Sequence, residues 1–130
     1  MSMEKKIFLA ASILGLIAVV LGAFAAHGLR NALDTTSLES FQTGVRYQMY
    51  HAFFLFVVGL IPQLHPQQKK RLFWLTLLGV LLFSGSIYLL ATNALTPIDF
   101  SFFGPVTPIG GLSLISAWGM LVFYFFKYKK

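Results

Sequence analysis

Four long apolar blocks restrict this chain to one class of fold. They lie at residues 7–26, 44–61, 72–90 and 109–126. Each reaches the roughly 17 to 25 residues that a helix needs to cross a hydrocarbon core about 30 Å thick. Hydrophobic residues make up 57% of the 130 residues and charged residues 11%, against about 45–50% and about 25% in soluble domains. The blocks therefore predict an all-α integral membrane protein.

The basic residues predict how these spans are oriented. Arg30 and Arg46 fall on one side of the expected spans. The other eight bases fall on the opposite side, with both termini: Lys5, Lys6, Lys69, Lys70, Arg71, Lys127, Lys129 and Lys130. By the positive-inside rule, the side rich in bases is cytoplasmic. We expect a multi-pass protein of the plasma (inner) membrane with both termini inside.

The predicted architecture is one transmembrane domain over residues 1–130, folded as a four-helix bundle. Its spans are expected at approximately 7–28, 44–61, 72–92 and 108–126. A cleaved signal peptide is the alternative for the first span, because Lys5, Lys6 and Ala23-Phe24-Ala25 resemble its charged and cleavage regions. A retained span is favoured, since this apolar stretch exceeds the about 7 to 15 residues usual in signal peptides.

Composition also argues against several function classes. The net charge of +6 is explained by orientation, and no basic stripe with stacking aromatics indicates nucleic-acid binding. The chain has no cysteine, so thiol catalysis and cysteine-bound clusters are excluded. We expect no metal, no cofactor and no enzymatic activity, because the histidines are isolated and the outer acids lie in loops.

Small residues predict where helices approach closely. They recur every three or four positions in the first span, at Ala11, Gly15, Ala18, Gly22 and Ala26. The fourth span has a similar set at Gly110, Gly111, Ser113 and Ala117. Such faces pack helices together in lipid. Packing within the chain is favoured, and contact with a second copy is the alternative.

Local patterns predict the helix boundaries. Thr36 and Glu39 have capping-box spacing, which predicts a helix start near Ser37. Pro62 should end that helix. A polar cytoplasmic loop with a solvated His65 is expected over 62–71. Thr107 before Pro108 predicts an N-cap and a first helical residue.

Polar residues of all four spans gather in the predicted outer half. The candidate pocket residues are His27, Arg30, Arg46, Tyr47, Gln48, His51, Tyr88 and Thr107. Ionisable side chains at this depth usually face a bundle interior or a cavity. For His51, a structural hydrogen bond, a ligand or proton role and headgroup contact all stay open. Arg30 and Arg46 can reach lipid phosphates or pair with outer acids.

Four stretches resemble the signature regions of the YgdD-like family of small four-span membrane proteins. They are "GAFAAHGL", "FQTGVRYQMYHA", "FSGSIYLLA" and "GPVTPIGGLSLISAW", in the family's order and over nearly the whole chain. Ala25 stands where that family would have glycine. The resemblance implies an integral membrane protein of unknown function, with no activity or catalytic residue to carry over.

These observations favour a non-enzymatic bundle with an outward-side polar pocket. It would hold a lipid or small amphipathic ligand, or support a partner protein. The expected partners are membrane lipids and, through the small-residue faces, a second copy. One alternative is a small transporter or proton-linked carrier that uses His51. Another is a haem or quinone redox module near His27 and His51.

The predicted orientation has a direct test. A tag at the carboxyl end should be labelled only after cells are permeabilised, because the bases near it hold that end in the cytoplasm. Labelling of intact cells by an impermeant reagent measures this. Labelling from outside would contradict the N-in, C-in topology.

Overall fold

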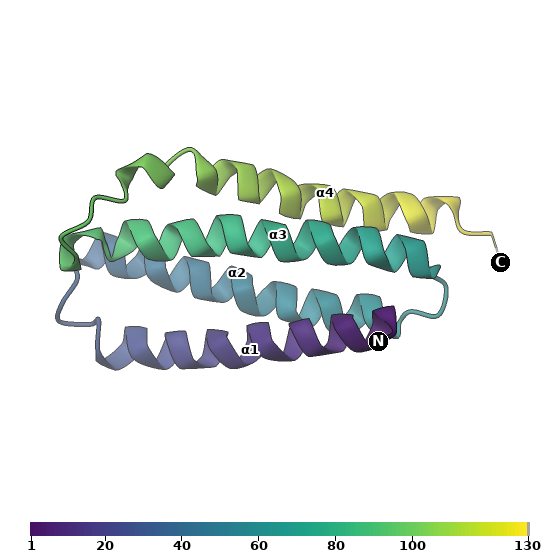
Figure 1. The fold of residues 1–130 in the computed structure, drawn as a ribbon, viewed down its shortest axis with the longest axis horizontal. Helices are drawn as coiled ribbons and strands as arrows, with labels where there is room; N and C mark the ends of the chain where they lie inside the picture. Colours follow the sequence, from purple (N-terminus) through teal and green to yellow (C-terminus); the bar gives the residue numbers. More distant parts are fainter. Residues whose placement is uncertain (130) are drawn as a thin grey trace.

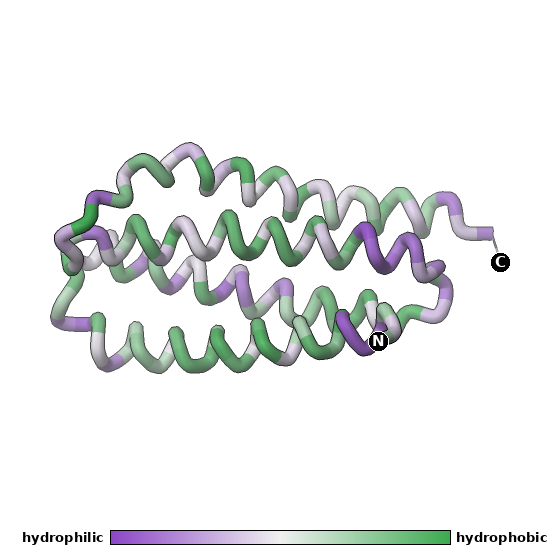
Figure 2. The backbone as a smooth tube through the Cα atoms, in the orientation of Figure 1, coloured by the Kyte–Doolittle hydropathy of each residue, from purple (hydrophilic) through white to green (hydrophobic). Residues whose placement is uncertain are grey.

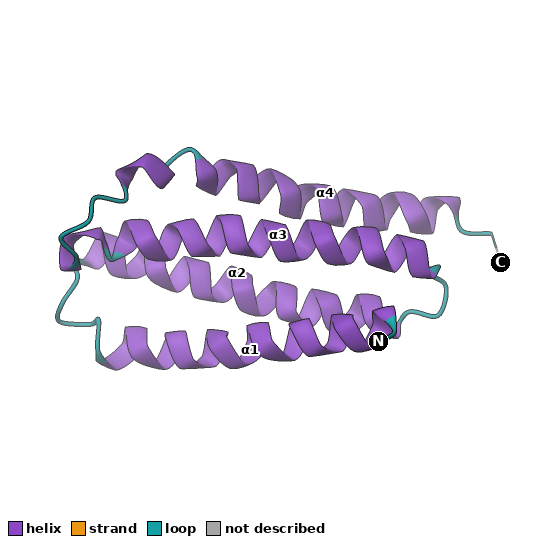
Figure 3. Ribbon diagram, in the orientation of Figure 1, coloured by secondary structure: helices purple, strands orange, loops and turns teal. Residues whose placement is uncertain are grey.

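The computed structural model describes residues 1–129 and contains four long helices. They are α1 Met3–His27, α2 Thr35–Leu60, α3 Pro66–Ala91 and α4 Val106–Lys127, with short 3-10 turns η1 Asn93–Leu95 and η2 Ser101–Phe103 before α4. Figure 3 shows short loops between the helices and no strand within the residues described. The predicted all-α fold is confirmed.

The helices pack mainly on their sequence neighbours (Figure 1). The α2–α3 pair lies in the middle, and α1 and α4 flank it on opposite sides. Over residues 1–129, extensive contact joins α1 to α2, α2 to α3 and α3 to α4, but not α1 to α4. The bundle is therefore open rather than square. Lipid explains this, because acyl chains solvate the outer apolar faces and no hydrophobic drive closes them together.

Three segments are long and apolar enough to cross a membrane: Met3–His27, Pro66–Ala91 and Ser101–Lys127. The second helix, α2, is as long as α3 but is not among them. Figure 2 shows more hydrophilic colour within α2 than within its neighbours, and hydrophilic residues gathered at the two ends of the bundle. Both termini lie at the same end (Figure 1). The four crossings and the N-in, C-in orientation stay predictions.

The start of α2 corrects one predicted cap. The N-cap residue is Asp34, whose carboxylate accepts a hydrogen bond from the backbone N–H of Ser37 at 2.7 Å. Thr36 is therefore already helical and caps nothing. Aspartate is among the strongest N-cap residues, which explains why the N-cap is Asp34 and not the threonine two residues later. The hydrogen bond from Ser37 also lowers the pKa of Asp34.

Proline ends α2 as predicted. The helix stops at Leu60, and Ile61 turns to extended backbone with φ −74° and ψ 114°. Pro62 forces this, because the residue before a proline is pushed out of the helical region.

The start of α3 corrects the predicted loop over 62–71. His65 is the N-cap and Pro66 the first helical residue, so residues 66–71 of that loop are helical. The predicted exposure of His65 is confirmed. Lys69, expected in solvent, is only 5% exposed. Its ammonium donates to the Gly59 carbonyl at 2.9 Å and to the Glu4 carboxylate at 3.2 Å, which ties three helices together.

The start of α4 also differs from the prediction. The helix begins at Val106, and Thr107 lies within its first turn. Pro108 is tolerated there because the N–H groups of the first turn have no helical partner. Thr107 is therefore no N-cap; its hydroxyl pairs with that of Ser86 instead.

Most of the small residues of α1 and α4 pack within the chain, as favoured, while Ala26 is exposed. On α1, Ala11 and Ala18 are fully buried, and a Cβ added to Gly15 would lie 3.9 Å from Ala52 of α2. On α4, Gly110 lies directly on α3, where an added Cβ would be 2.3 Å from the backbone nitrogen of Phe83. Only glycine permits that approach.

The Gly110→Ala variant should be strongly destabilised, by about 1–3 kcal/mol or more, because its methyl group would overlap α3 backbone. Gly119→Ala on the same helix is the matched control, since nothing lies within 4 Å of a Cβ added there. Thermal unfolding in mild detergent measures both variants. Equal melting temperatures would contradict the close α3–α4 contact.

Candidate functional site

A layer of polar side chains separates two apolar clusters of the core. One cluster includes Leu14, Leu55 and Val80, and the smaller one, toward the predicted outer end, includes Phe41 and Ala91. The side chains between them come from α2 and α3. They are Gln48, His51, Ser84, Ser86 and Tyr88.

Gln48 joins three helices inside this layer. Its amide nitrogen donates to the Leu14 carbonyl of α1 at 2.8 Å. Its amide oxygen accepts from the Tyr88 hydroxyl of α3 at 2.7 Å. The side chain is 4% exposed. Two predicted pocket residues, Gln48 and Tyr88, therefore do meet, and their polar atoms satisfy one another as buried polar groups require.

His51 is held by partners at both ring nitrogens. Its Nδ1 lies 2.6 Å from the Tyr47 carbonyl oxygen, and its Nε2 lies 3.1 Å from the Trp118 indole nitrogen of α4. A carbonyl only accepts and an indole N–H only donates, so Nδ1 carries the proton and Nε2 accepts. The structure thus favours the structural hydrogen bond among the three roles considered for His51.

The serines of α3 also bond across helices. Ser84 donates to the Gly44 carbonyl of α2 at 2.7 Å. Ser86 donates to the Phe83 carbonyl of its own helix and pairs with Thr107 of α4. On α4, Ser113 donates to the Leu75 carbonyl at 2.7 Å. These bonds fix the register of α3 against both neighbours.

Three predicted pocket residues lie on the surface, apart from this layer. His27 ends α1 and is exposed, and Arg30 follows it in the loop. Arg46 is exposed and donates to the Thr43 hydroxyl at 3.0 Å. Neither arginine pairs with an acid within residues 1–129, where the single ion pair is Lys69–Glu4. Of the two partners considered for the arginines, the outer acids are therefore not used within residues 1–129.

Two of the outer acids are engaged by backbone groups instead. Asp34 caps α2, and Asp99 accepts from the backbone N–H of Ser101 at 3.0 Å. This hydrogen bond lowers the pKa of Asp99. A backbone N–H group nearby in the sequence reaches each carboxylate. This bond has a lower entropic cost than an ion pair, which would order a long arginine side chain.

The eight predicted residues therefore do not line one pocket. Thr107 lines an outer cavity of about 350 Å³, and Tyr47 and His51 line a groove of about 380 Å³. Gln48 and Tyr88 line a groove between α1 and α3, on another side of α2. Arg30 lies beside a small cavity between α1 and α2. His27 and Arg46 line none of the cavities described.

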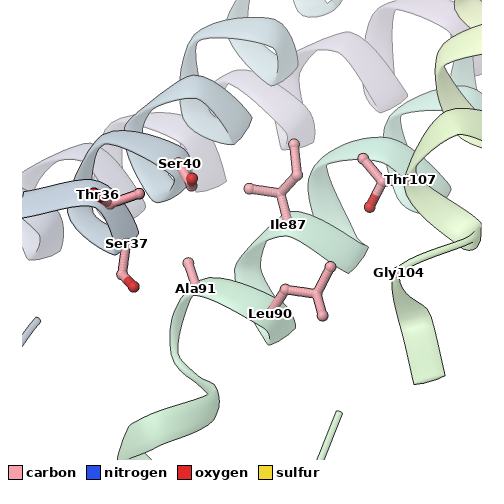
Figure 4. A pocket seen from close by; sticks show the side chains of 8 residues that line it. All are labelled: Thr36, Ser37, Ser40, Ile87, Leu90, Ala91, Gly104 and Thr107. Atoms are coloured by element: carbon pink, nitrogen blue, oxygen red, sulfur yellow. The ribbon is translucent and has the colours of Figure 1, made fainter. Parts of the chain in front are cut away.

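The outer pocket lies between the first turns of α2, the end of α3 and the start of α4 (Figure 4). Figure 4 shows the hydroxyl side chains of α2 on one side of the pocket, Thr107 and Gly104 on the other, and the apolar side chains of α3 between them. Its lining residues are Thr36, Ser37, Ser40, Ile87, Leu90, Ala91, Gly104 and Thr107. Four of them carry hydroxyl groups and none is charged.

The lateral groove lies deeper, between α2 and α4 with α3 as its floor. It is lined by Tyr47, His51, Phe83, Gly111, Leu114, Ile115 and Trp118. Ile115 is 67% exposed and Trp118 49%. The groove is therefore open along the side of the bundle and has mainly apolar and aromatic walls.

Sequence reasoning missed Trp118 and the hydroxyls of Thr36, Ser37 and Ser40. A signal for Trp118 was present, because a tryptophan far from either span end needs an acceptor for its N–H. The three hydroxyl residues carried no such signal, since Ser and Thr are common near a helix start.

Comparisons with known proteins now identify the family. Residues 21–111 match the family described as "Protein of unknown function (DUF423)". The chain belongs to this family. It is 38% identical over 126 residues to the UPF0382 membrane protein YwdK of Bacillus subtilis, which covers 95% of this chain and 98% of that protein. No solved structure matches the chain.

Two further relatives have similar coverage. The UPF0382 membrane protein of Haemophilus influenzae is 38% identical over 128 residues, 98% of each chain. The UPF0382 inner membrane protein YgdD of Escherichia coli is 36% identical over 115 residues, 86% of this chain and 82% of that protein. The predicted family and membrane location are confirmed, and no relative's name states an activity.

The Trp118→Phe variant should lose about 1–3 kcal/mol of unfolding free energy, because it leaves the buried Nε2 of His51 without a donor. Trp74→Phe is the matched control, since Trp74 is 48% exposed and its indole makes no hydrogen bond within residues 1–129. Denaturant unfolding in detergent measures the difference, and ¹⁵N NMR of His51 reports the tautomer. Equal losses would contradict the His51–Trp118 bond.

Proposed function

We propose that this protein is a non-enzymatic membrane protein that binds a lipid or other small amphipathic molecule. The polar end of the ligand would lie in the outer pocket and its apolar part in the lateral groove. The observation that carries this proposal is that the two cavities follow one another along the same faces of three helices.

Helix periodicity supports this alignment. Ile87 of the outer pocket lies one turn from Phe83 of the groove on α3, and Thr107 lies one turn from Gly111 on α4. Residues four apart share a helix face. From Thr107 to Trp118 the α4 axis rises about 16 Å, at about 1.5 Å per residue. That length suits an acyl chain reaching from the interface into the hydrocarbon region.

The chemistry of the lining supports an amphipathic ligand. The outer pocket offers hydroxyl groups, which donate and accept hydrogen bonds without selecting a charge. The groove offers apolar walls and the satisfied His51–Trp118 pair. A ligand chain that enters it leaves the hydrogen bond between Trp118 and His51 intact.

The same contacts support a binding role rather than a catalytic or proton-carrying one. A serine hydrolase needs a nucleophile that reaches a base. Ser84 donates to Gly44, and both ring nitrogens of His51 are engaged. A proton-linked carrier would have to break the bond from Trp118 each time Nε2 took a proton.

The redox alternative has weaker geometric support. Gly15 of α1 lies level with Ala52 of α2, next to His51. His27 lies more than three turns beyond Gly15, which is about 18 Å at about 1.5 Å per residue. Two axial ligands of one haem must approach the same iron from opposite sides, which this separation does not allow.

The Gly111→Leu variant tests the proposal because its side chain would fill the groove. A Cβ at Gly111 meets Phe83 at an ordinary 3.6 Å, so the helix should fold. Native mass spectrometry in mild detergent should find a retained amphipathic molecule on the wild type and a severalfold lower occupancy on Gly111→Leu.

Gly119→Leu is the matched control, with the same added volume on an exposed position of the same helix. It should retain the molecule like the wild type. A wild-type spectrum without any retained molecule, or equal retention in both variants, would contradict the proposal. The same spectra report whether a second copy is bound, which stays a prediction.

A further inference from the structure

A separate cavity of about 270 Å³ lies at the opposite end of the bundle, between the start of α3 and the end of α4. Both chain termini lie at this end (Figure 1). Residues that line it include Gln63, His65, Gln68, Tyr124, Lys127 and Lys129. We call it the basic-end cavity.

Positive charge around this cavity is nearly uncompensated. Besides the two lysines that line it, the same end carries Lys5, Lys6, Lys70 and Arg71, all exposed. Among residues 1–129, the acid at this end is Glu4, which is paired with the buried Lys69. An anion in the cavity would therefore meet an excess of cations, near water and the lipid headgroups.

Tyr124 supplies a polar group that protein contacts leave unsatisfied. Its side chain lines the cavity and is 8% exposed. Its hydroxyl is buried and has no hydrogen-bond partner within residues 1–129. A buried polar group without a partner costs about 1–3 kcal/mol. A ligand acceptor within reach of this hydroxyl would remove that cost.

Three of the neighbouring side chains, Gln68, Lys127 and Lys129, add donors. The Gln68 amide oxygen already accepts from the backbone N–H of His65 at 2.9 Å, which leaves the amide nitrogen as the available group. Lys127 and Lys129 supply ammonium groups. Several donors with positive charge match a phosphate group, which offers acceptor oxygens and negative charge.

The two ends of the bundle differ in the charge of the residues that line their cavities. The outer pocket is lined by hydroxyl groups and no base, and Asp34 and Asp99 lie at that end. The basic-end cavity is lined by two lysines and no acid. Charge complementarity therefore selects an anionic group at one end alone.

We propose that the basic-end cavity binds a phosphate group, held by Lys127, Lys129 and the Tyr124 hydroxyl. An anionic phospholipid headgroup and inorganic phosphate share this chemistry. Basic pockets between helices at a membrane surface bind such headgroups. This site is independent of the amphipathic ligand proposed for the outer pocket and the lateral groove.

The test measures lipid binding to the full chain by native mass spectrometry, with phosphatidylglycerol and phosphatidylcholine as the probes. Phosphatidylglycerol should bind severalfold more tightly to the wild type. The Tyr124→Phe variant keeps the ring and every charge, and should lose about tenfold in affinity, as expected for one hydrogen bond to a charged group. The double variant K127Q/K129Q should lose at least as much.

K5Q/K6Q is the matched control, because it removes the same charge from the same end at residues that do not line the cavity. It should retain most of the phosphatidylglycerol affinity. Equal losses in the two double variants would overturn the proposal in favour of general surface charge. Unchanged affinity in Tyr124→Phe would overturn it as well.

Inorganic phosphate, as a second probe, distinguishes binding of the free ion from binding of a lipid headgroup. If phosphate raises the melting temperature of the wild type but not of Tyr124→Phe, the cavity takes the free ion. If phosphatidylglycerol alone has this effect, the site is a headgroup site. Stabilisation by neither probe would overturn the proposal, while retention of a molecule in the groove would be unaffected.

Discussion

Buried hydrogen bonds between helices are the interactions on which the rest of this structure depends. Lipid offers no water to satisfy a polar group and no hydrophobic drive between helices. The bonds from Gln48 to Leu14, from Tyr88 to Gln48 and from Ser84 to Gly44 therefore fix the register of α1, α2 and α3 against one another. Close contact at glycines then lets the helices come near enough to make such bonds, as Gly110 does between α4 and α3.

This constraint also distinguishes the engaged polar groups of the central layer from the hydroxyl groups of the outer pocket. Within the central layer, the polar groups of Gln48 and His51 all have hydrogen-bond partners in the protein. They therefore hold helices together and need no ligand to satisfy them. The hydroxyl groups that line the outer pocket come from the first turns of α2 and the start of α4. Because α1 and α4 flank the α2–α3 pair on opposite sides, a groove stays open along the bundle.

The two ends of the molecule carry different chemistry on the same scaffold. One end presents hydroxyl groups, and the carboxylates of Asp34 and Asp99 there accept hydrogen bonds from backbone N–H groups. The other concentrates lysines, and its Glu4 is bound to the buried Lys69. The comparisons name a family of unknown function, so the functional proposals rest on these local differences in charge and hydrogen bonding.

The sequence by itself determined the all-α membrane fold, the family and the end of α2 just before Pro62, because apolar length and proline geometry act locally. It also indicated which residues are buried and polar, such as Gln48 and His51. Only the tertiary structure decided their partners. Trp118 is 67 residues from His51 in the chain, and nothing in either local sequence specifies that pairing. For the same reason, Lys69 was expected in water and lies instead among three helices, where Glu4 and the Gly59 carbonyl offset the cost of burying its charge.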